Sequence, residues 1–275
     1  MIKQRLQRRI NAVVIGVSTG GPAALEKVFA SMSAPLPVPV LVVQHMPASF
    51  TGMLAERLNR VATARVVEAS TGVVPEPGTI YIAPGGHHMS MVDTTTEPQI
   101  RLNTLPPVNS CRPAVDVLFK ATAEIWGPNQ LAVVMTGMGS DGLAGCQQLA
   151  RHGVEIFVQD EASSVVWGMP GAVSRAGLAT RTVTLERLGA AIEERVHSTP
   201  QLGQAMTQRQ WERRRRATDN DPKPDSISNR LKKQGLVVPN TDTQTPQSPR
   251  AAAAEAARRA REAVESTRRG MRSAE

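Results

Sequence analysis

Short runs of apolar, β-branched residues alternate with longer segments whose apolar positions recur every three or four residues. Residues 12–17 form such a run and are typical of a buried strand. The segment 22–32 that follows has the spacing of a helix, with Leu25, Val28 and Phe29 on one face. This change of period, from a continuous apolar run to a helical stripe, is repeated along most of the chain.

The same pattern predicts the remaining elements. Strands are expected at 38–43, 79–83, 131–135 and 155–159, and helices at 49–61, 114–125, 142–152 and 185–196. Residues 89–92 and 99–102 read as two antiparallel strands joined by a polar turn. Because strands alternate with helices, we predict an α/β fold: a doubly wound, mostly parallel sheet with helices on both faces and a small antiparallel hairpin.

Composition supports one sizeable core. The chain has 275 residues, of which 41% are hydrophobic and only 3% aromatic. Such a core must consist of Val, Ile, Leu, Ala and Met, a mixture that suits parallel strands buried under helices. We therefore expect a basic N-terminal segment at 1–10, followed by one large α/β domain at 11–198.

Positive charge is concentrated at the C-terminal end. Residues 1–202 hold 16 basic and 15 acidic residues, whereas residues 203–275 hold 16 and 9. Residues 199–275 are predicted to be a basic, largely disordered tail, with a solvated helix at 251–269. Binding of nucleic acid or an acidic surface by this tail is an alternative, which the shortage of aromatic residues disfavours because Trp211 alone lies among its charges.

Other sequence features bear on the compartment. No apolar run reaches the length of a membrane span, and no apolar signal region follows the basic start, so we expect no membrane insertion. The two cysteines, Cys111 and Cys146, are too few for a disulfide framework or a structural zinc site. These features predict a cytoplasmic protein.

Three predicted strands end in residues that carry chemistry, and the first of them ends at Ser18. Residues 16–20, GVSTG, satisfy the G-x-S-x-G pattern of a nucleophile elbow between a strand and a helix. The helix that follows offers free N–H groups to a developing oxyanion. The alternatives are a phosphate-binding turn or a simple turn in which Ser18 or Thr19 caps the helix.

The other two strand ends supply a base and an acid. His45 follows the second strand and can act as a general base, although His87 and His88 could line the same cleft. Asp141 lies in the flexible segment TGMGSDG at 136–142, where it could orient the imidazole or merely cap the next helix. The order Ser, His, Asp differs from the Ser, Asp, His order of ordinary α/β hydrolases.

Several longer segments now carry a family resemblance. The chain resembles the catalytic domain of the chemotaxis protein-glutamate methylesterases, which are also protein-glutamine deamidases. The matching segments are IGVSTGGP (15–22), VVQHMP (42–47), YIAPGGHHM (81–89), PPVNSCRPAVDVLF (106–119), VVMTGMGSDGLAG (133–145) and DEASSVVWGMPGAV (160–173). Six motifs in the family's order are far more specific than any one of them.

The resemblance implies roles for individual residues. The family's nucleophile, base and acid fall on Ser18, His45 and Asp141. Its oxyanion donors are backbone N–H groups, of which one falls on Met138, and Thr19 is a second candidate. The chemistry implied needs no metal and no organic cofactor.

The resemblance also implies substrates and partners. The family removes methyl groups from glutamyl esters on the cytoplasmic helices of methyl-accepting chemoreceptors, and Arg112 is placed to orient such an acidic helix. The receiver domain of the best-known member has no counterpart before residue 11, so we expect a standalone catalytic domain that works with a separate response regulator or kinase. A non-catalytic partner-binding module on the same fold is the competing hypothesis.

Overall fold

The computed structural model describes residues 8–95 and 97–198. The predicted tail and its helix at 251–269 therefore lie outside the described residues, as does most of the N-terminal segment. The strands are β1 (Ala12–Val17), β2 (Val40–Gln44), β3 (Arg65–Glu68), β4 (Thr79–Ile82), β5 (His88–Val92), β6 (Gln99–Asn103), β7 (Gln130–Val134), β8 (Glu155–Gln159) and β9 (Arg181–Val183). The helices are α2 (Gly21–Ala30), α3 (Ala48–Val61), α4 (Val115–Trp126), α5 (Leu143–Arg151), α6 (Met169–Arg175) and α7 (Leu185–His197).

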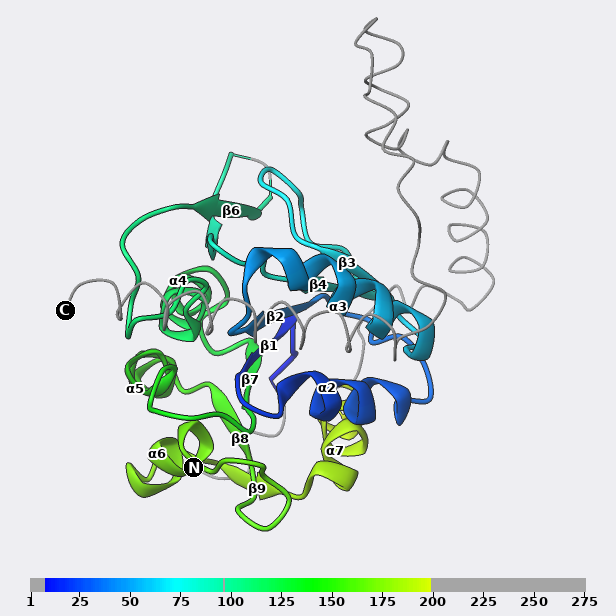
Figure 1. Cartoon of the computed structure of the whole chain (residues 1–275), viewed down its shortest axis with the longest axis vertical. Helices are drawn as coiled ribbons and strands as arrows, with labels where there is room; N and C mark the ends of the chain where they lie inside the picture. The colour runs from blue at the N-terminus through cyan, green and yellow to red at the C-terminus, as the bar shows by residue number, and fades with distance from the viewer. Residues whose placement is uncertain (1–7, 96, 199–275) are drawn as a thin grey trace, which may run out of the picture. The chain divides into compact units, whose positions relative to one another are not determined.

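Seven of these strands form one sheet, in the order β3-β4-β2-β1-β7-β8-β9, and all neighbours are parallel (Figure 1). β1, β2 and β7 are buried along their whole length. Since such strands are covered on both faces, they read as continuous apolar runs, which is why the sequence predicted them well. The doubly wound α/β fold predicted from the sequence is confirmed.

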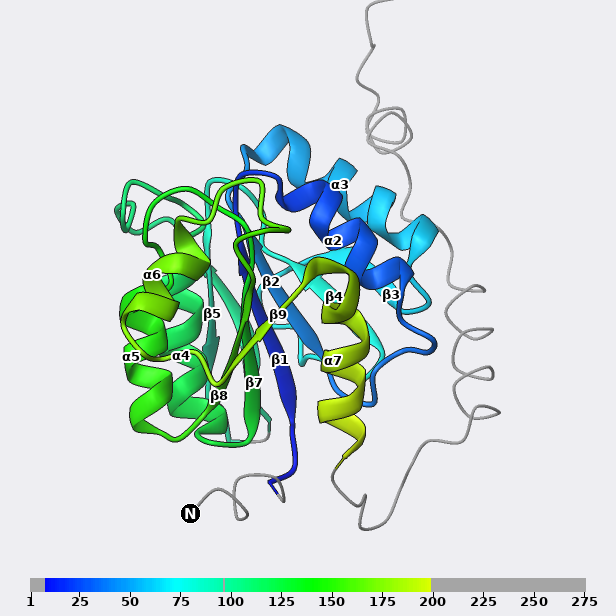
Figure 2. The same ribbon diagram turned by 90° about the horizontal axis from the view of Figure 1, so that it is seen from below.

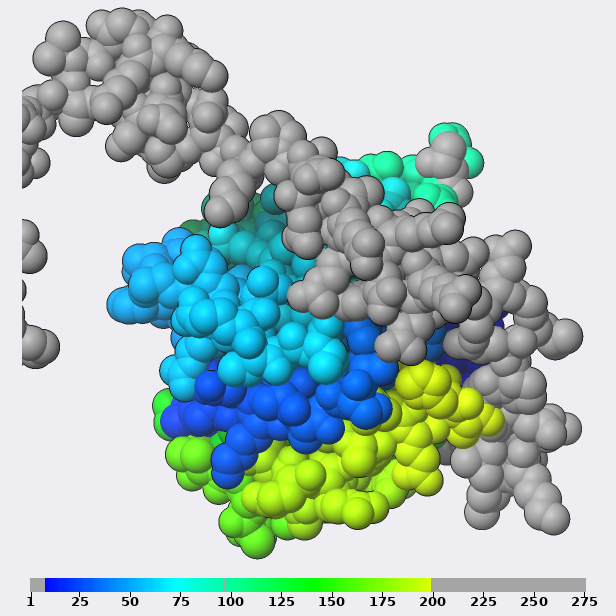
Figure 3. Space-filling view, turned by 90° about the vertical axis from the view of Figure 1, so that its right-hand side faces the viewer, coloured from blue at the N-terminus to red at the C-terminus, as the bar shows by residue number. Residues whose placement is uncertain are grey.

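Helices cover both faces of the sheet (Figure 2). One hydrophobic cluster joins one face to α2, α3 and α7, and alternate side chains of β1, such as Val13 and Ile15, point into it. The other cluster takes Val14 and joins the opposite face to α4, α5, α6 and the hairpin. Figure 3 shows α3, α2 and α7 side by side on the first face. None of the described helices is long and apolar enough to span a membrane.

The antiparallel hairpin is also present. β5 pairs with β6 in the register His88↔Asn103 to Val92↔Gln99. Met89, Met91 and Ile100 are buried against the same cluster as α4. The hairpin thus packs against α4, which follows it in the chain.

Three short elements were missed by the sequence analysis: β3, β9 and α6. β3 and β9 are the two edge strands, four and three residues long. Their exposed ends, such as Arg65 and Arg181, remove the apolar run that marks a central strand. α6 has seven residues, too few to show a helical period.

Candidate active site

Ser18, His45 and Thr136 lie side by side at the carboxyl edge of the sheet. The pairing of β1 with β2 ends at Val17↔Gln44, and that of β1 with β7 at Gly16↔Val134. The next residues continue both pairings, since Ser18 N–H donates to Thr136 O at 2.9 Å and His45 N–H donates to Val17 O at 3.2 Å. The chain leaves β1 toward β2 and returns to β7 on its other side, so this edge is the switch point where α/β sheets bind ligands.

The turn after β1 holds Ser18 at the start of α2. Gly20 has φ 80° and caps the helix, a left-handed conformation that glycine adopts without strain. Gln44 is buried beneath the turn, and its Nε2 donates to the carbonyl oxygens of Ser18 and His45, both at 3.0 Å. One amide thereby fixes the backbone of the predicted nucleophile to that of the predicted base.

His45 is paired with Asp141. Its Nε2 lies 2.7 Å from Asp141 Oδ2, and Asp141 is 3% exposed. The Ser18 hydroxyl makes no hydrogen bond to any other described residue; in enzymes without substrate this contact is often loose. The structure therefore joins the predicted base to the predicted acid and brings the backbone of Ser18 beside that of His45 through strand register.

Asp141 is held by more than its histidine. Besides His45 Nε2 it accepts hydrogen bonds, between 2.6 and 3.2 Å, from Asn109 Nδ2 and from the backbone N–H groups of Val115, Asp116 and Gly142. Burial raises the pKa of this carboxyl, but the hydrogen bonds from His45, Asn109 and the backbone outweigh burial and leave its pKa below the ordinary value of 3.8. Asp141 is thus an ionised acceptor that fixes the imidazole tautomer with the proton on Nε2.

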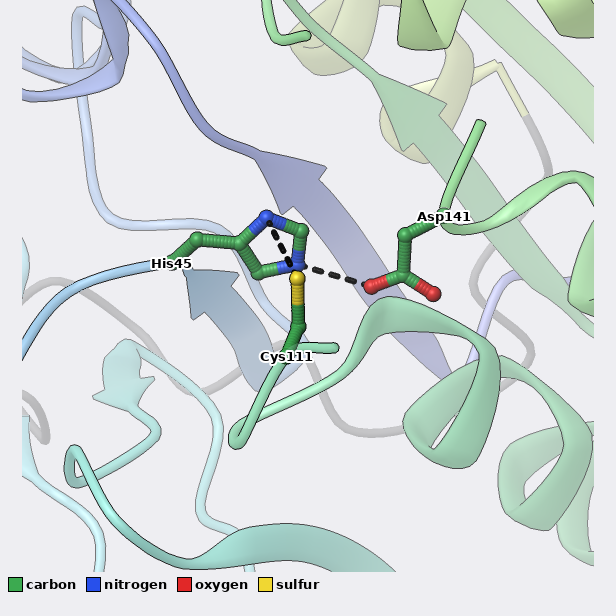
Figure 4. Close-up of side chains that lie close together, drawn as sticks. All are labelled: His45, Cys111 and Asp141. Carbon is green, nitrogen blue, oxygen red and sulfur yellow. Dashed lines mark hydrogen bonds and ion pairs between the residues drawn. The ribbon is translucent and has the colours of Figure 1, made fainter. Parts of the chain in front are cut away.

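A half-buried cysteine lies against the same histidine. Cys111 Sγ is 3.6 Å from His45 Nδ1, as the close-up in Figure 4 shows. Burial, and secondly the charge of Asp141, raise the pKa of its thiol, so the sulfur carries a proton at neutral pH. Nothing in the sequence indicated this contact between Cys111 and the predicted base.

A comparison with known families shows the family of the domain that holds this site. A sequence model of the CheB methylesterase family matches residues 13–192. This chain belongs to the CheB methylesterase family. The match spans all three strand ends that carry Ser18, His45 and Asp141.

Individual relatives support this family assignment. A protein-glutamate methylesterase/protein-glutamine glutaminase of Trichodesmium erythraeum is 46% identical over 193 residues, which are 70% of this chain and 55% of the relative. A protein of the same name from a Nocardioides species is 49% identical over 184 residues, 67% of this chain and 50% of the relative. The chain thus spans about half the length of the curated relatives it matches.

A solved structure has the same fold as this chain. The crystal structure of the Thermotoga maritima CheB methylesterase catalytic domain is 36% identical and superimposes with a TM-score of 0.66. The similarity covers 67% of this chain and 98% of that domain.

Two backbone N–H groups at the carboxyl edge of the sheet are free to donate to a ligand. Thr19, just after Ser18, and Met138, in the loop after β7, are both exposed. Neither backbone N–H donates to another described residue. Both groups can therefore serve a developing oxyanion, as predicted from the sequence, and that role stays a prediction.

Arg112 is engaged within its own loop. Its Nη1 donates to the carbonyl oxygens of Thr104 at 2.9 Å and Leu105 at 3.2 Å. The guanidinium thus braces the segment before α4, and its predicted contact with a substrate helix stays a prediction.

The other histidines have separate positions. His88 is buried: its Nε2 donates to Pro106 O at 3.1 Å and its Nδ1 accepts from Ala114 N–H at 3.2 Å. These bonds hold His88 against the loop before α4, and the buried ring does not line the cleft, as the sequence analysis had considered possible. His87 is exposed, and its ring contacts Gly85 O. Sequence reasoning did not find the loop roles of His88 and Asn109, because both depend on contacts made across the loop.

Proposed function

We propose that this chain hydrolyses γ-glutamyl methyl esters on the cytoplasmic helices of chemoreceptors, with Ser18 as nucleophile, His45 as base and Asp141 as the orienting acid. The observation that carries the proposal is the hydrogen bond between His45 Nε2 and Asp141 Oδ2, at 2.7 Å, beside a serine on the neighbouring strand end. The names of the relatives support the ester and the amide as substrates.

Hydrolysis begins at Ser18. The Nε2–H of His45 points to Asp141, so Nδ1 is the unprotonated nitrogen, and its lone pair accepts only the weak S–H contact of Cys111. Nδ1 takes the hydroxyl proton as the Ser18 oxygen attacks the ester carbonyl, and ionised Asp141 stabilises the imidazolium that forms. The negative charge of the buried carboxylate thus stabilises the positive charge that the reaction places on His45.

The tetrahedral oxyanion forms beside the N-terminus of α2. The N–H groups of Thr19 and Met138 donate to it, and such a donor typically contributes about 3–4 kcal/mol to the transition state. His45 then returns its proton to the departing methanol. A water molecule, activated by the same imidazole, hydrolyses the acyl-serine and leaves a free glutamate.

Glutamine follows the same path with ammonia in place of methanol. We expect the amide to be the poorer substrate, because amide resonance makes its carbonyl less electrophilic and its nitrogen is a poorer leaving group than the ester oxygen, although His45 protonates both. A separate response regulator or kinase is the partner expected to regulate either reaction.

The test measures methanol released from methylated receptor by the purified chain. Ser18→Ala should lower the rate by about 10⁵-fold or more, the loss seen when a triad nucleophile is removed. Ser49→Ala is the matched control, since it removes an exposed serine hydroxyl from the start of α3, near the same edge.

Two results would reject the assignment. Undiminished methanol release by Ser18→Ala would exclude this nucleophile. A wild-type chain that binds methylated receptor, yet releases no methanol from it or from a model ester, would be a non-catalytic receptor-binding module.

A further inference from the structure

Three side chains with metal-binding atoms, one of them the predicted catalytic histidine, lie close together. Cys111 Sγ, a ring nitrogen of His45 and a carboxylate oxygen of Asp141 all lie within 4.8 Å of one another (Figure 4). Within residues 8–95 and 97–198, no other group of three His, Cys, Asp or Glu side chains is so arranged. The proposed hydrolysis uses His45 and Asp141 but leaves Cys111 without a role.

The distances suit one small cation. Zinc binds sulfur at about 2.3 Å and nitrogen or oxygen at about 2.0–2.2 Å, so two ligand atoms on a tetrahedral ion lie about 3.3–3.6 Å apart. Cys111 Sγ lies 3.6 Å from His45 Nδ1, and the ligand atoms of all three residues lie within 4.8 Å of one another, so about an ångström of side-chain movement brings the sulfur into range of an ion held by Nε2 and Oδ2. The Nε2 to Oδ2 separation of 2.7 Å must widen by about half an ångström.

Asp141 is already positioned for this role. Its Oδ1 is held by Asn109 and by two backbone N–H groups, and its Oδ2 by His45 and Val115 N–H. A cation between Oδ2 and Nε2 replaces one hydrogen bond, from His45, and leaves the others in place. Thiolate, imidazole and carboxylate together favour Zn²⁺ over Mg²⁺ or Ca²⁺, which take oxygen ligands.

We propose that Cys111, His45 and Asp141 form a binding site for a thiophilic divalent cation, with Zn²⁺ as the best match, and that this cation inhibits the esterase. The fourth position on the ion is left for water, as in three-ligand zinc sites. The ion is an inhibitor here and takes no part in hydrolysis.

Binding and inhibition follow from one proton balance. The Cys111 thiol gives its proton to solvent and becomes a thiolate ligand. The His45 proton moves from Nε2 to Nδ1, so one proton is released for each cation bound. With metal on Nε2 and hydrogen on Nδ1, the imidazole can no longer accept the Ser18 proton. The inhibition rests on the proposed function, whereas the binding does not.

The binding test uses the purified 275-residue chain. All five histidines and both cysteines lie within the described residues, so few competing sites with nitrogen or sulfur ligands exist. We expect one Co²⁺ per chain with a thiolate-to-cobalt charge-transfer band, and one Zn²⁺ by calorimetry with release of one proton. Cys111→Ser should lose the band and bind Zn²⁺ more than about 100-fold more weakly, a larger loss than outer-shell changes cause.

The other cysteine provides the control. Cys146 is fully buried on α5 and contributes to the core, so Cys146→Ala should keep both the band and the affinity. The wild-type chain gives a second readout that needs no variant: bound Zn²⁺ should protect Cys111 from alkylation, as located by mass spectrometry. A charge-transfer band that never forms, equal Zn²⁺ affinity in Cys111→Ser, or alkylation unaffected by Zn²⁺ would each overturn the site.

Inhibition is measured as the ratio of methanol release with Zn²⁺ to release with EDTA, so each variant serves as its own reference. In wild type, methanol release with Zn²⁺ should be at least about tenfold lower than release with EDTA, and in Cys111→Ser the two rates should differ much less. A chain that binds Zn²⁺ through Cys111 but never hydrolyses ester would reject the proposed function and leave the site intact. A chain that hydrolyses ester with an unchanged ratio would overturn the inhibition.

Discussion

At the scale of single residues, the carboxylate of Asp141 is fixed mainly by the first residues of α4 and by Asn109 in the segment before that helix. Asn109 has φ 52° in the left-handed region, and its Nδ2 donates to Asp116 at 2.9 Å and to Asp141 at 2.8 Å. One amide group thus bridges two buried carboxylates, each of which needs donors to remain buried. Asn109 therefore acts on catalysis through Asp141, as a positioning residue.

Asn109→Gly should weaken both stability and turnover. Glycine keeps the left-handed backbone and removes only the amide, which donates to charged groups, so we expect a loss of about 2 kcal/mol in the free energy of unfolding at neutral pH. kcat should fall, with little change in KM. Ser110→Gly is the control, because Ser110 is also left-handed, at φ 61°, and is exposed. Equal effects of the two variants would remove the positioning role.

The same variant has a pH signature. The folded pKa of Asp141 lies below 3.8, so its ionised form stabilises the fold above that pH, and this contribution is lost as the pH falls below it. Removing one of the hydrogen bonds that lower the pKa should matter most at neutral pH. In urea unfolding with EDTA present, the stability gap between Asn109→Gly and wild type should therefore shrink on acidification; a gap independent of pH would contradict this.

The sequence predicted the residues at strand ends better than those in loops. Ser18, His45 and Asp141 follow buried apolar runs, and parallel strands bring their carboxyl ends to one edge, so their meeting could be expected. The bridge from Asn109 and the contact of Cys111 depend on how residues 106–114 fold back over that edge. Such a path is set by tertiary contacts, among them those of His88, and carries no periodic signal.

At the scale of elements, the site depends on how closely β1 approaches the loop after β7. A Cβ added to Gly137 would lie 2.8 Å from Ser18 Cβ and closer still to Met169 Sδ. Long central strands were predicted from their apolar runs, but this approach was not, because the need for glycine at position 137 arises only when two strand ends meet. The short edge strands β3 and β9 escaped prediction for a different reason, since their exposed ends break the apolar run.

Gly137→Ala should therefore displace the nucleophile. The overlap with Ser18 must be relieved by moving one strand end, and overpacking of this kind costs about 1–3 kcal/mol of stability. We expect a fall in kcat that is larger than this loss of stability explains, measured under conditions where circular dichroism shows the variant to be folded. Gly52→Ala is the control: it lies in α3, meets only Glu68 at 3.9 Å, and should be neutral or stabilising. Wild-type kcat in a folded Gly137→Ala would contradict the displacement.

At the scale of the whole domain, exposed apolar side chains gather around the catalytic edge. Among the described residues, six large hydrophobic side chains are exposed, and four of them form what we call the apolar rim: Phe50 (49%), Met53 (55%), Met138 (74%) and Val165 (69%). Phe50 and Met53 lie in the helix after His45, Met138 lies in the loop before Asp141, and Val165 packs beside Gly20. A small ester would need no such surface, whereas a protein helix would cover it.

The apolar rim should therefore contribute to binding of a protein substrate and little to the chemistry. Replacing Phe50 and Val165 by serine removes two apolar contacts of about 1 kcal/mol each, so KM for methylated receptor should rise about fivefold for each change, with kcat nearly constant. Hydrolysis of a small methyl ester should change much less, because such a substrate reaches only the nucleophile and the oxyanion donors.

Val61→Ser is the matched control, since Val61 is another of the six exposed apolar residues, 37% exposed, at the far end of α3. If the variants with serine at 50 and 165 lost activity on both substrates equally, the effect would lie in the active site; if Val61→Ser raised KM as much, general surface hydrophobicity would explain it. A rise confined to the receptor and to the rim variants would identify this edge as the surface on which the substrate helix lies.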